Sequence, residues 1–421
     1  MINLLFDDVK KPNVFLSNAP IQVSDHPLPS SYIEHKNYIL SNENWNIYTQ
    51  LSLLFKQFLD NLNIINPDEI NSVSSFIYPV IMNEPYFHIR SIINNSHVDF
   101  GFWSHINPKI IESLRKKKGH IIIDISTEPC NESELNAAIE ALKDCSQFPN
   151  DRIHLNLSDQ RYVNNKNTHC FPSTLECHAI QKFSKLYESF DLDTNLISTK
   201  ERRKIRNNTH YNKKRYLLLN NRADKQISGP LVVYFLNSIN ALDKGLISLD
   251  NKGNNFSEIF NESIKNYSNI THEEIPNLSN YVYEGLYLSK AMESVDFNIV
   301  VETHLNRDVF DWPLITEKIF RNVSYDMPFI VLGPPQTLYW FRQLGYSTFH
   351  PYIDESYDEI SNDFIRIKSV LKEISKLIAL SDTEIKEFKN NCKPIHEKNK
   401  QNFLNRQNEL KVFLTTLGCT F

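Results

Sequence analysis

Short segments made almost wholly of apolar residues recur along this chain, and they constrain its fold more than any other feature. Residues 120–126, 297–301 and 328–333 are the clearest of these segments. A strand with one face in water alternates apolar and polar residues, whereas a nearly continuous apolar run is typical of a strand buried on both faces of a parallel sheet. The sequence therefore predicts an α/β protein built on parallel sheets.

Segments with helical periodicity lie between these runs. The segment 132–145 reads as a helix between strands at 120–126 and 152–157, and this order forms a βαβ unit. The second half repeats the alternation of strand and helix. Further strands are expected at 75–81, 87–93, 215–220 and 245–249, and further helices at 45–62, 108–117, 231–242, 316–322, 337–344, 364–380 and 381–413.

The length of the chain favours two domains. Its 421 residues are too many for one ordinary core and fit two domains of about 150–200 residues each. A polar and basic stretch at 191–215 separates the two βα-rich halves. We therefore expect a Rossmann-like, doubly wound domain at 1–205 and a second at 206–395, facing each other across a cleft. A C-terminal helix at 396–421 is expected to cross back to the first domain.

Charge and hydropathy exclude several protein classes. The formal net charge of −5 argues against an overall basic nucleic-acid binder. No run approaches the ~18 apolar residues of a membrane span, so we expect a cytoplasmic protein, with peripheral contact to the inner face of the membrane left open. The six cysteines form no CxxC pair, and the group of His169, Cys170, Cys177 and His178 is only a weak metal signal.

One basic run, at 200–215, departs from the overall charge. It reads either as a solvated linker or as a patch that attracts phosphates or an anionic acceptor.

Polar residues next to the buried strands of the second half are the candidates for ligand binding. Open parallel sheets bind their ligands outside the carboxyl ends of the strands. These positions follow a strand or open the helix between two strands. They are Asn220, Arg222, Glu302, Thr316, Glu317, Lys318 and Gly333.

The segment Thr316-Glu317-Lys318 combines several features that suit a phosphate. Thr316 is a good N-cap, and the helix dipole favours Glu317 in the first turn. The free N–H groups of a helix N-terminus bind phosphate, and Lys318 adds a positive charge. A carboxylate from Glu317 or Glu302 could accept hydrogen bonds from ribose hydroxyls, so the group could hold a nucleoside diphosphate and stabilise it as it leaves. The alternative is plain helix capping for stability.

The order of motifs in this half resembles the donor-binding half of the family-ten glycosyltransferases, the α-1,3-fucosyltransferase group. That group carries a strand ending in a Phe-Glu-Asn-Ser-like motif, then Tyr-x-Thr-Glu-Lys, then an apolar strand of the type Pro-x-Val-x-x-Gly. The counterparts here are Val-Glu-Thr-His at 301–304, Leu-Ile-Thr-Glu-Lys-Ile-Phe at 314–320 and Pro-Phe-Ile-Val-Leu-Gly at 328–333.

Two further motifs are similar to uncharacterised glycosyltransferase-like proteins of bacteria and phages. These are Leu-Asn-Asn-Arg at 219–222 and Lys-Gly-Leu at 244–246, and the whole resemblance covers roughly residues 215–360.

The resemblance implies a GT-B type fold and gives roles to individual residues. It places Glu317 on the ribose, Lys318 and Arg222 on the diphosphate, and Glu302 at the sugar end of the donor. It also implies that no divalent metal is required, because the helix terminus and the basic residues stabilise the diphosphate. The motif around Glu302 and the position of Leu314 differ from the family pattern, so fucose is not fixed as the sugar.

An inverting transferase needs a carboxylate or a histidine to take the proton of the acceptor. In the resembled group this base comes from the N-terminal domain, and Asp124 and Glu128 lie at and just after the strand expected at 120–126. As alternatives, Asp124 caps a turn and Glu128 lies in solvent; His304 is a further candidate base. Dinucleotide-binding, Walker and Gly-x-Ser-x-Gly motifs are absent, which argues against dehydrogenases and P-loop kinases.

The sequence thus predicts a glycosyltransferase, hexosyl- or fucosyltransferase-like, of the kind used in polysaccharide biosynthesis. It would move a sugar from a nucleotide-sugar donor to a glycan, a lipid-linked or another hydroxyl acceptor by metal-independent inverting displacement. Two alternatives stay open. One is a transferase that uses a nucleoside-monophosphate-activated acid sugar, and the other is a non-catalytic carbohydrate- or nucleotide-binding protein on the same fold.

Overall fold

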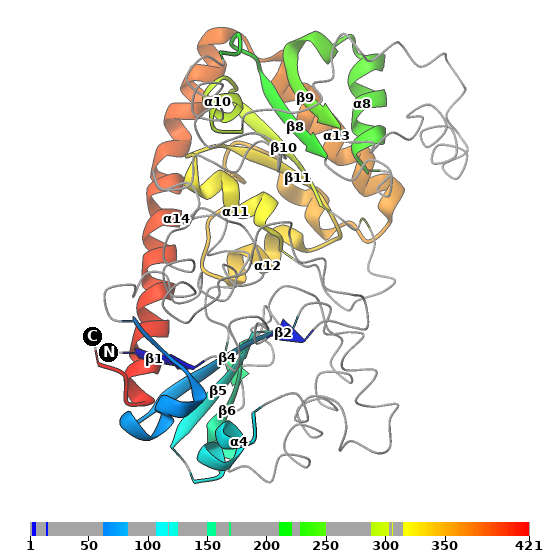
Figure 1. Cartoon of the computed structure of the whole chain (residues 1–421). Coiled ribbons are helices and arrows are strands. Elements are labelled where there is room, and N and C mark those ends of the chain that lie inside the picture. Colours follow the sequence, from blue (N-terminus) through cyan, green and yellow to red (C-terminus); the bar gives the residue numbers. More distant parts are fainter. Residues whose placement is uncertain are drawn as a thin grey trace. The chain divides into compact units, whose positions relative to one another are not determined.

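The computed structural model divides into two compact units (Figure 1). Unit 1 comprises Met1–Lys182 and Asn402–Phe421, and unit 2 comprises Phe183–Gln401. The expected boundaries at 205/206 and 395/396 differ from the divisions at 182/183 and 401/402. The structure describes residues 2–5, 14–15, 62–82, 107–116, 118–124, 150–156, 168–169, 210–220, 228–249, 288–302, 305 and 315–420.

Unit 1 contains a parallel sheet. Its strands lie in the order β3-β1-β4-β5-β6-β7, and β2 also pairs with β4. The strands expected at 75–81, 120–126 and 152–157 are confirmed. The bounds are β1 (Ile2–Leu5), β2 (Val14–Phe15), β3 (Leu62–Ile65), β4 (Phe76–Met82), β5 (Gly119–Asp124), β6 (Ile153–Asn156), β7 (Thr168–His169), α4 (Pro108–Arg115), η2 (Pro67–Ser72) and η5 (Asn150–Arg152).

Some expectations for the first half differ from the structure, and others concern residues outside the described ranges. Local sequence patterns do not predict the bounds of β1 and β3, because β1 has only four residues and β3 follows a segment with helical spacing. The helix expected at 132–145 and the strand expected at 87–93 lie outside the described residues.

Unit 2 contains a second parallel sheet, with its strands in the order β11-β10-β8-β9. The chain passes from β8 to its neighbour β9 and then returns past β8 to form β10 on the other side. The winding direction therefore reverses between β8 and β10. The bounds are β8 (Tyr216–Asn220), α8 (Ser228–Ser238), η7 (Leu242–Lys244), β9 (Gly245–Leu249), α10 (Leu288–Glu293), β10 (Phe297–Val301), α11 (Glu317–Ser324), β11 (Phe329–Leu332), α12 (Thr337–Gln343), η9 (Glu355–Glu359), α13 (Asp363–Ala379) and α14 (Asp382–Thr416).

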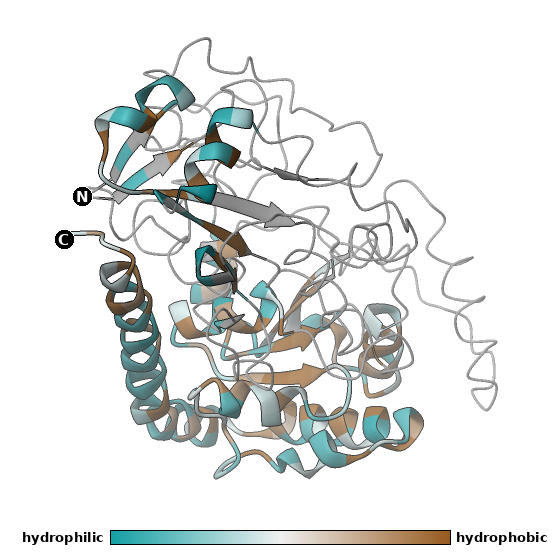
Figure 2. Ribbon diagram, turned by 90° about the horizontal axis from the view of Figure 1, so that it is seen from below, coloured by the Kyte–Doolittle hydropathy of each residue, from teal (hydrophilic) through white to brown (hydrophobic). Residues whose placement is uncertain are grey.

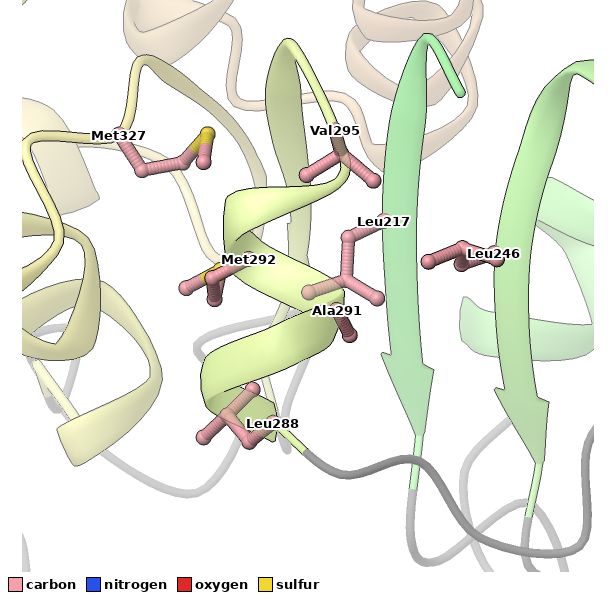
Figure 3. Close-up of a cluster of buried hydrophobic side chains, with 7 residues drawn as sticks. All are labelled: Leu217, Leu246, Leu288, Ala291, Met292, Val295 and Met327. Atoms are coloured by element: carbon pink, nitrogen blue, oxygen red, sulfur yellow. The ribbon is translucent and has the colours of Figure 1, made fainter. Parts of the chain in front are cut away.

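Helices cover both faces of the unit 2 sheet, as a doubly wound fold requires. Leu217 and Asn298 are paired in register and so share a face. On this face α10 packs on Leu217 in a buried apolar cluster (Figure 3), and Asn322 of α11 bonds Asn298. Tyr216 points to the other face, where its hydroxyl donates to the carbonyl of Ala241, just after α8. The fold class predicted from the sequence, α/β with Rossmann-like sheets, is confirmed.

Two neighbouring strands of unit 2 are buried along their whole length. Every residue of β10 and β11 is buried, and Figure 2 shows these strands as apolar against a largely hydrophilic α14. The continuous apolar runs at 297–301 and 328–333 therefore have the environment that their composition predicted. No helix in the described part of the chain is long and apolar enough to cross a bilayer.

Both sheets place a glycine opposite an aromatic ring at the start of a strand. Gly119 pairs in register with Phe76, and Gly245 pairs with Tyr216. A Cβ on Gly245 would lie 2.1 Å from Cε2 of Tyr216, so the ring occupies the space of a side chain. Tyr216 is fully buried and its hydroxyl is bonded, so the ring cannot easily move aside.

We expect Gly245→Ala to lower the free energy of unfolding by about 1–3 kcal/mol, because the new methyl group overpacks against the Tyr216 ring. Urea unfolding of the variant measures this. In a Tyr216→Ala background the same substitution should cost much less, since the ring is gone. Equal costs in both backgrounds would contradict the assigned contact.

Three histidines on neighbouring strands of unit 1 form a hydrogen-bonded row. His120 Nδ1 lies 3.0 Å from His154 Nε2, and His154 Nδ1 lies 3.3 Å from His169 Nε2. The Arg152 guanidinium donates to His120 Nε2 at 2.8 Å. Each ring in the row is therefore neutral and carries its proton on Nδ1. Phe413 of α14 packs on His154 and His169. His169 therefore serves the packing of unit 1, and its possible metal partners lie outside the described residues.

Burial lowers the pKa of His154 to about 3, and it lowers the pKa of His120 and of His169 to about 4. In the unfolded chain a histidine protonates below about 6.5. The unfolded state therefore binds more protons than the folded state below that pH, and stability falls as the pH is lowered from about 6.5 toward 4.

We expect His154→Gln to reduce the loss of unfolding free energy between pH 7 and pH 4.5, because one buried titrating ring is removed while hydrogen-bonding capacity stays. Chemical unfolding monitored at several pH values measures the slope. An unchanged slope would show that this histidine does not set the acid sensitivity of the fold.

Candidate functional site

The candidate site lies at the carboxyl ends of the unit 2 strands, where the winding direction reverses. Asn220 is the last residue of β8, Glu302 directly follows β10, and Gly333 directly follows β11. Reversal of strand order leaves a crevice above the sheet edge, and ligands of doubly wound folds bind there. The structure thus brings the predicted positions Glu302, Thr316 and Gly333 to one edge.

A buried carboxylate organises this edge. The Thr316 hydroxyl lies 3.0 Å from Oε1 and 2.8 Å from Oε2 of Glu302, to which it donates. The same hydroxyl accepts the backbone N–H of Lys318 at 3.2 Å, as an N-cap of α11 does. The Lys318 ammonium lies 3.6 Å from Glu302 Oε2. One threonine therefore joins the end of β10 to the start of α11.

Glu302 is enclosed by its surroundings. It is 1% exposed, and this burial raises the pKa of its carboxyl, which Lys318 and Thr316 partly oppose. A Cβ on Gly333 would lie 3.2 Å from Glu302 Cγ and 3.1 Å from Thr337 Oγ1. The absence of a side chain at Gly333 is what lets Glu302 pack so closely.

The position of α11 is fixed by two buried asparagines. Asn298, the second residue of β10, donates to Asn322 Oδ1 at 2.8 Å. Asn322 in turn donates to the carbonyl of Lys318 at 2.9 Å and to that of Ile319 at 3.2 Å. These bonds set the rotation of α11 on the sheet and therefore the direction in which its first turn points.

Among the described residues of this cluster, Glu317 and Lys318 have side chains that a ligand can reach. Their side chains are 24% and 25% exposed, against 2% for Glu302. Glu317 also forms an ion pair at 3.5 Å with Arg321, one turn further along α11. The first turn of α11 thus presents one carboxylate and one ammonium to the outside, with Glu302 behind them.

A buried arginine connects the loops at this edge, and the local sequence did not predict this role. Arg366 of α13 donates to the carbonyls of Gly333 at 3.0 Å, of Ile360 at 2.9 Å and of Leu305. It is 1% exposed. The sequence gives one sign of this arginine. Arg366 is a charged residue four positions before Val370, so it lies on the apolar side of the helix.

The N-terminus of α12, the helix that follows β11, is capped by a carboxylate side chain. Asp358 accepts the backbone N–H groups of Leu338 at 2.8 Å and Tyr339 at 2.7 Å. Arg342 contacts Glu355 at 3.1 Å, which also accepts the N–H of Phe349. Asp358 occupies the positions that a phosphate would need, so α12 offers no open anion site.

The remaining predicted residues are placed only in part. Asp124 is the last residue of β5, at the carboxyl edge of the unit 1 sheet, but its side chain is not described; the same holds for the side chain of Asn220. Arg222, Glu128 and His304 lie outside the described residues.

Among the residues that the structure describes, no group of three or more His, Cys, Asp and Glu side chains is arranged to hold a metal ion. The expectation that the reaction needs no metal stays a prediction.

Comparison with known proteins gives a loose likeness only. No family profile and no curated protein sequence matches the chain. Among solved structures it is similar to the trehalose-6-phosphate synthase OtsA, with 11% identity and a TM-score of 0.44 over 92% of this chain and 85% of that chain.

Two further structures are similar at the same level. One is a UDP-forming α,α-trehalose-phosphate synthase from Burkholderia xenovorans, with 9% identity and a TM-score of 0.41 over 100% of this chain and 99% of that one. The other is the N-terminal domain of Candida albicans trehalose-6-phosphate phosphatase, with 10% identity and a TM-score of 0.40 over 99% and 96%. All three TM-scores are below 0.5, so the likeness is too weak to assign a function to this chain.

We expect Thr316→Val to lower the free energy of unfolding of unit 2 by roughly 2–4 kcal/mol, because it removes the α11 cap and leaves Glu302 buried without its donor. Thr316→Ser keeps the hydroxyl and is the matched control, with a much smaller expected loss. Chemical unfolding measures both. Equal losses for Val and Ser would show that the hydroxyl contributes little.

Proposed function

We propose that unit 2 binds the nucleotide part of a nucleotide-sugar and that the protein is a glycosyltransferase. The observation that carries the proposal is the Glu302–Thr316–Lys318 cluster at the point where the winding of the sheet reverses. The cluster holds a helix N-terminus and an ammonium group at the edge where ligands bind in this class of fold. Plain capping needs only Thr316, and it does not account for a buried carboxylate that also attracts Lys318.

The proposed contacts assign one role to each accessible group. The N-terminus of α11 and Lys318 contact the diphosphate, and Glu317 accepts hydrogen bonds from the ribose hydroxyls. Asn220, the last residue of β8 on the other side of the reversal point, and Arg222, two residues further along the chain, complete the donor site. This arrangement matches the order of motifs shared with the α-1,3-fucosyltransferase group, and the sugar is a hexose or fucose.

Glu302 acts in this proposal mainly as a positioning residue. Its burial and its bond to Thr316 support this role, in which Glu302 lies behind the first turn of α11 and does not touch the sugar. Its carboxylate orients the Thr316 hydroxyl and lies 3.6 Å from the Lys318 ammonium. A change at Glu302 would therefore weaken donor binding through the geometry of α11.

The proposed reaction is a metal-independent inverting displacement. A carboxylate of unit 1, Asp124 or Glu128, takes the proton of an acceptor hydroxyl on a glycan or lipid-linked acceptor. The acceptor oxygen attacks the anomeric carbon, and the bond from that carbon to the nucleoside diphosphate breaks. Lys318 and the α11 N-terminus stabilise the charge on the leaving diphosphate.

A panel of nucleoside diphosphates and nucleotide-sugars tests the proposal. We expect at least one of them to raise the melting temperature of the full chain and to bind in calorimetry. Lys318→Ala and Glu317→Ala should each weaken that binding by roughly tenfold, because each removes one polar contact to the ligand. Lys368→Ala, on the exposed surface of α13, is the matched control and should leave binding unchanged.

The outcome separates the candidate functions. Binding together with sugar transfer or slow donor hydrolysis supports the transferase, and a preference for nucleoside-monophosphate sugars supports the acid-sugar alternative. Binding without turnover would favour a nucleotide- or carbohydrate-binding protein. If no nucleotide binds and both substitutions are silent, the proposal fails.

A further inference from the structure

A charged pocket lies at the opposite edge of the unit 2 sheet, at the amino ends of β8 and β10. Its volume is about 770 Å³, which suits a small organic molecule. Arg215 directly precedes β8, Asp296 directly precedes β10, and one side of α14 completes the walls. The cationic side chains that line it are Lys213, Arg215, Lys386, Lys389, Lys393 and Lys400.

Three of these cations crowd around one carboxylate. Asp296 is 5% exposed, and its Oδ1 lies 2.9 Å from Lys213 Nζ and 3.3 Å from Lys389 Nζ. Its Oδ2 lies 3.3 Å from Arg215 Nη1. Burial and the charge of Lys213 both lower the pKa of Lys389. Asp296 thus shares its single negative charge among three cations, and a further anion beside them would be electrostatically favourable.

The other charged groups of the lining do not cancel this excess of positive charge. Asp382 pairs with Arg215 at 2.6 Å, and Asp326 pairs with Lys400 at 2.6 Å. With Glu397, the described residues of the lining comprise four carboxylates and six cations.

Two lysines of α14 are available for a ligand. Lys386 and Lys393 are seven residues apart, so they project from the same side of the helix into the pocket lining. Within the described part of the chain they make no hydrogen bond or ion pair, and both are exposed.

A buried polar atom also lacks a partner in this lining. His396 is 4% exposed, and its Nε2 has no hydrogen bond within the described residues. Buried ring nitrogens in native structures are usually bonded, so an unbonded one calls for a partner that the described residues do not supply.

We infer that this pocket binds a small polyanion that carries at least two phosphate groups, with Lys213, Lys386, Lys389 and Lys393 as its cationic contacts. A single phosphate would fill little of the volume, and a neutral sugar would leave the excess charge in place. The basic run at 200–215, which reads either as a linker or as a phosphate-attracting patch, contributes its last residues to this pocket. For those residues the second interpretation is the one that the geometry favours.

The pocket is separate from the proposed donor site. The pocket residue Asp296 precedes β10 and the donor-site residue Glu302 follows it, so the two sites lie a strand length apart, about 16 Å for five residues. Substrates of doubly wound folds bind at the carboxyl edge. A ligand at the amino edge is therefore a second ligand, and α11, which begins at one site and ends next to Asp326 of the other, connects them.

Calorimetry with inorganic tripolyphosphate, on the full chain at low salt, tests the inference. We expect binding that weakens as salt is added, because the contacts are ionic. The double variant Lys386→Glu/Lys393→Glu should weaken it by roughly tenfold or more, since two unpaired cations become anions. Both positions are exposed, so the variant should melt like the parent.

A second double variant controls for net charge. Lys368→Glu/Lys398→Glu changes the formal charge equally at exposed positions outside the pocket and should bind tripolyphosphate within about twofold of the parent. Lys318→Ala should also retain binding, which separates this pocket from the donor site. The inference is overturned if the parent does not bind, if the two double variants behave alike, or if Lys318→Ala abolishes binding.

Discussion

A strand buried on both faces can carry ionised groups only at its two ends, and this constraint shapes unit 2. All five residues of β10 are buried, and a carboxylate stands at each end: Asp296 before the strand and Glu302 after it. An unpaired buried charge is costly, so each carboxylate must gather cations or hydroxyl donors from neighbouring elements. The partners of these two carboxylates form the two polar sites of unit 2.

The two carboxylates differ in the partners that surround them. Glu302 gathers one hydroxyl and one ammonium, and its own pKa is raised by burial. It thereby orders the first turn of α11 and leaves Glu317 and Lys318 at the surface. Asp296 gathers three cations from two segments that are far apart in the chain. The first arrangement presents a helix terminus, and the second leaves an excess of positive charge in a pocket. Asn298, between them, holds α11 in register with the strand.

Much of the described fold of unit 2 could be predicted from local sequence. Apolar runs predicted β10 and β11, and helical spacing predicted α13. Just after α12, Gly345 has a positive φ, a conformation that suits glycine and is common where helices end. Unit 1 was less predictable. Its strand β1 has four residues, and a strand this short acquires its identity from pairing with β3 and β4 rather than from its own pattern.

The candidate donor site was predictable in its members but not in their roles. Strand ends and an N-cap are local signals, so Glu302, Thr316 and Lys318 could be selected. That Glu302 is enclosed by Gly333 and bonded to Thr316 could not be, because the contact joins residues from separate elements. Arg366 illustrates the same limit: a single arginine on an apolar stripe carries no sign of the carbonyls that it bonds.

The sequence by itself determined the α/β class, the buried strands and the polar residues at their carboxyl ends, because periodicity and strand-end chemistry are properties of neighbouring residues. The tertiary structure alone decided which charges meet. The run 200–215 and the lysines of α14 are separated by about 170 residues, and only folding brings Lys213 and Lys389 to the same oxygen of Asp296. Coulombic interaction depends on the distance between charges in space, and the order of residues along the chain does not determine that distance directly.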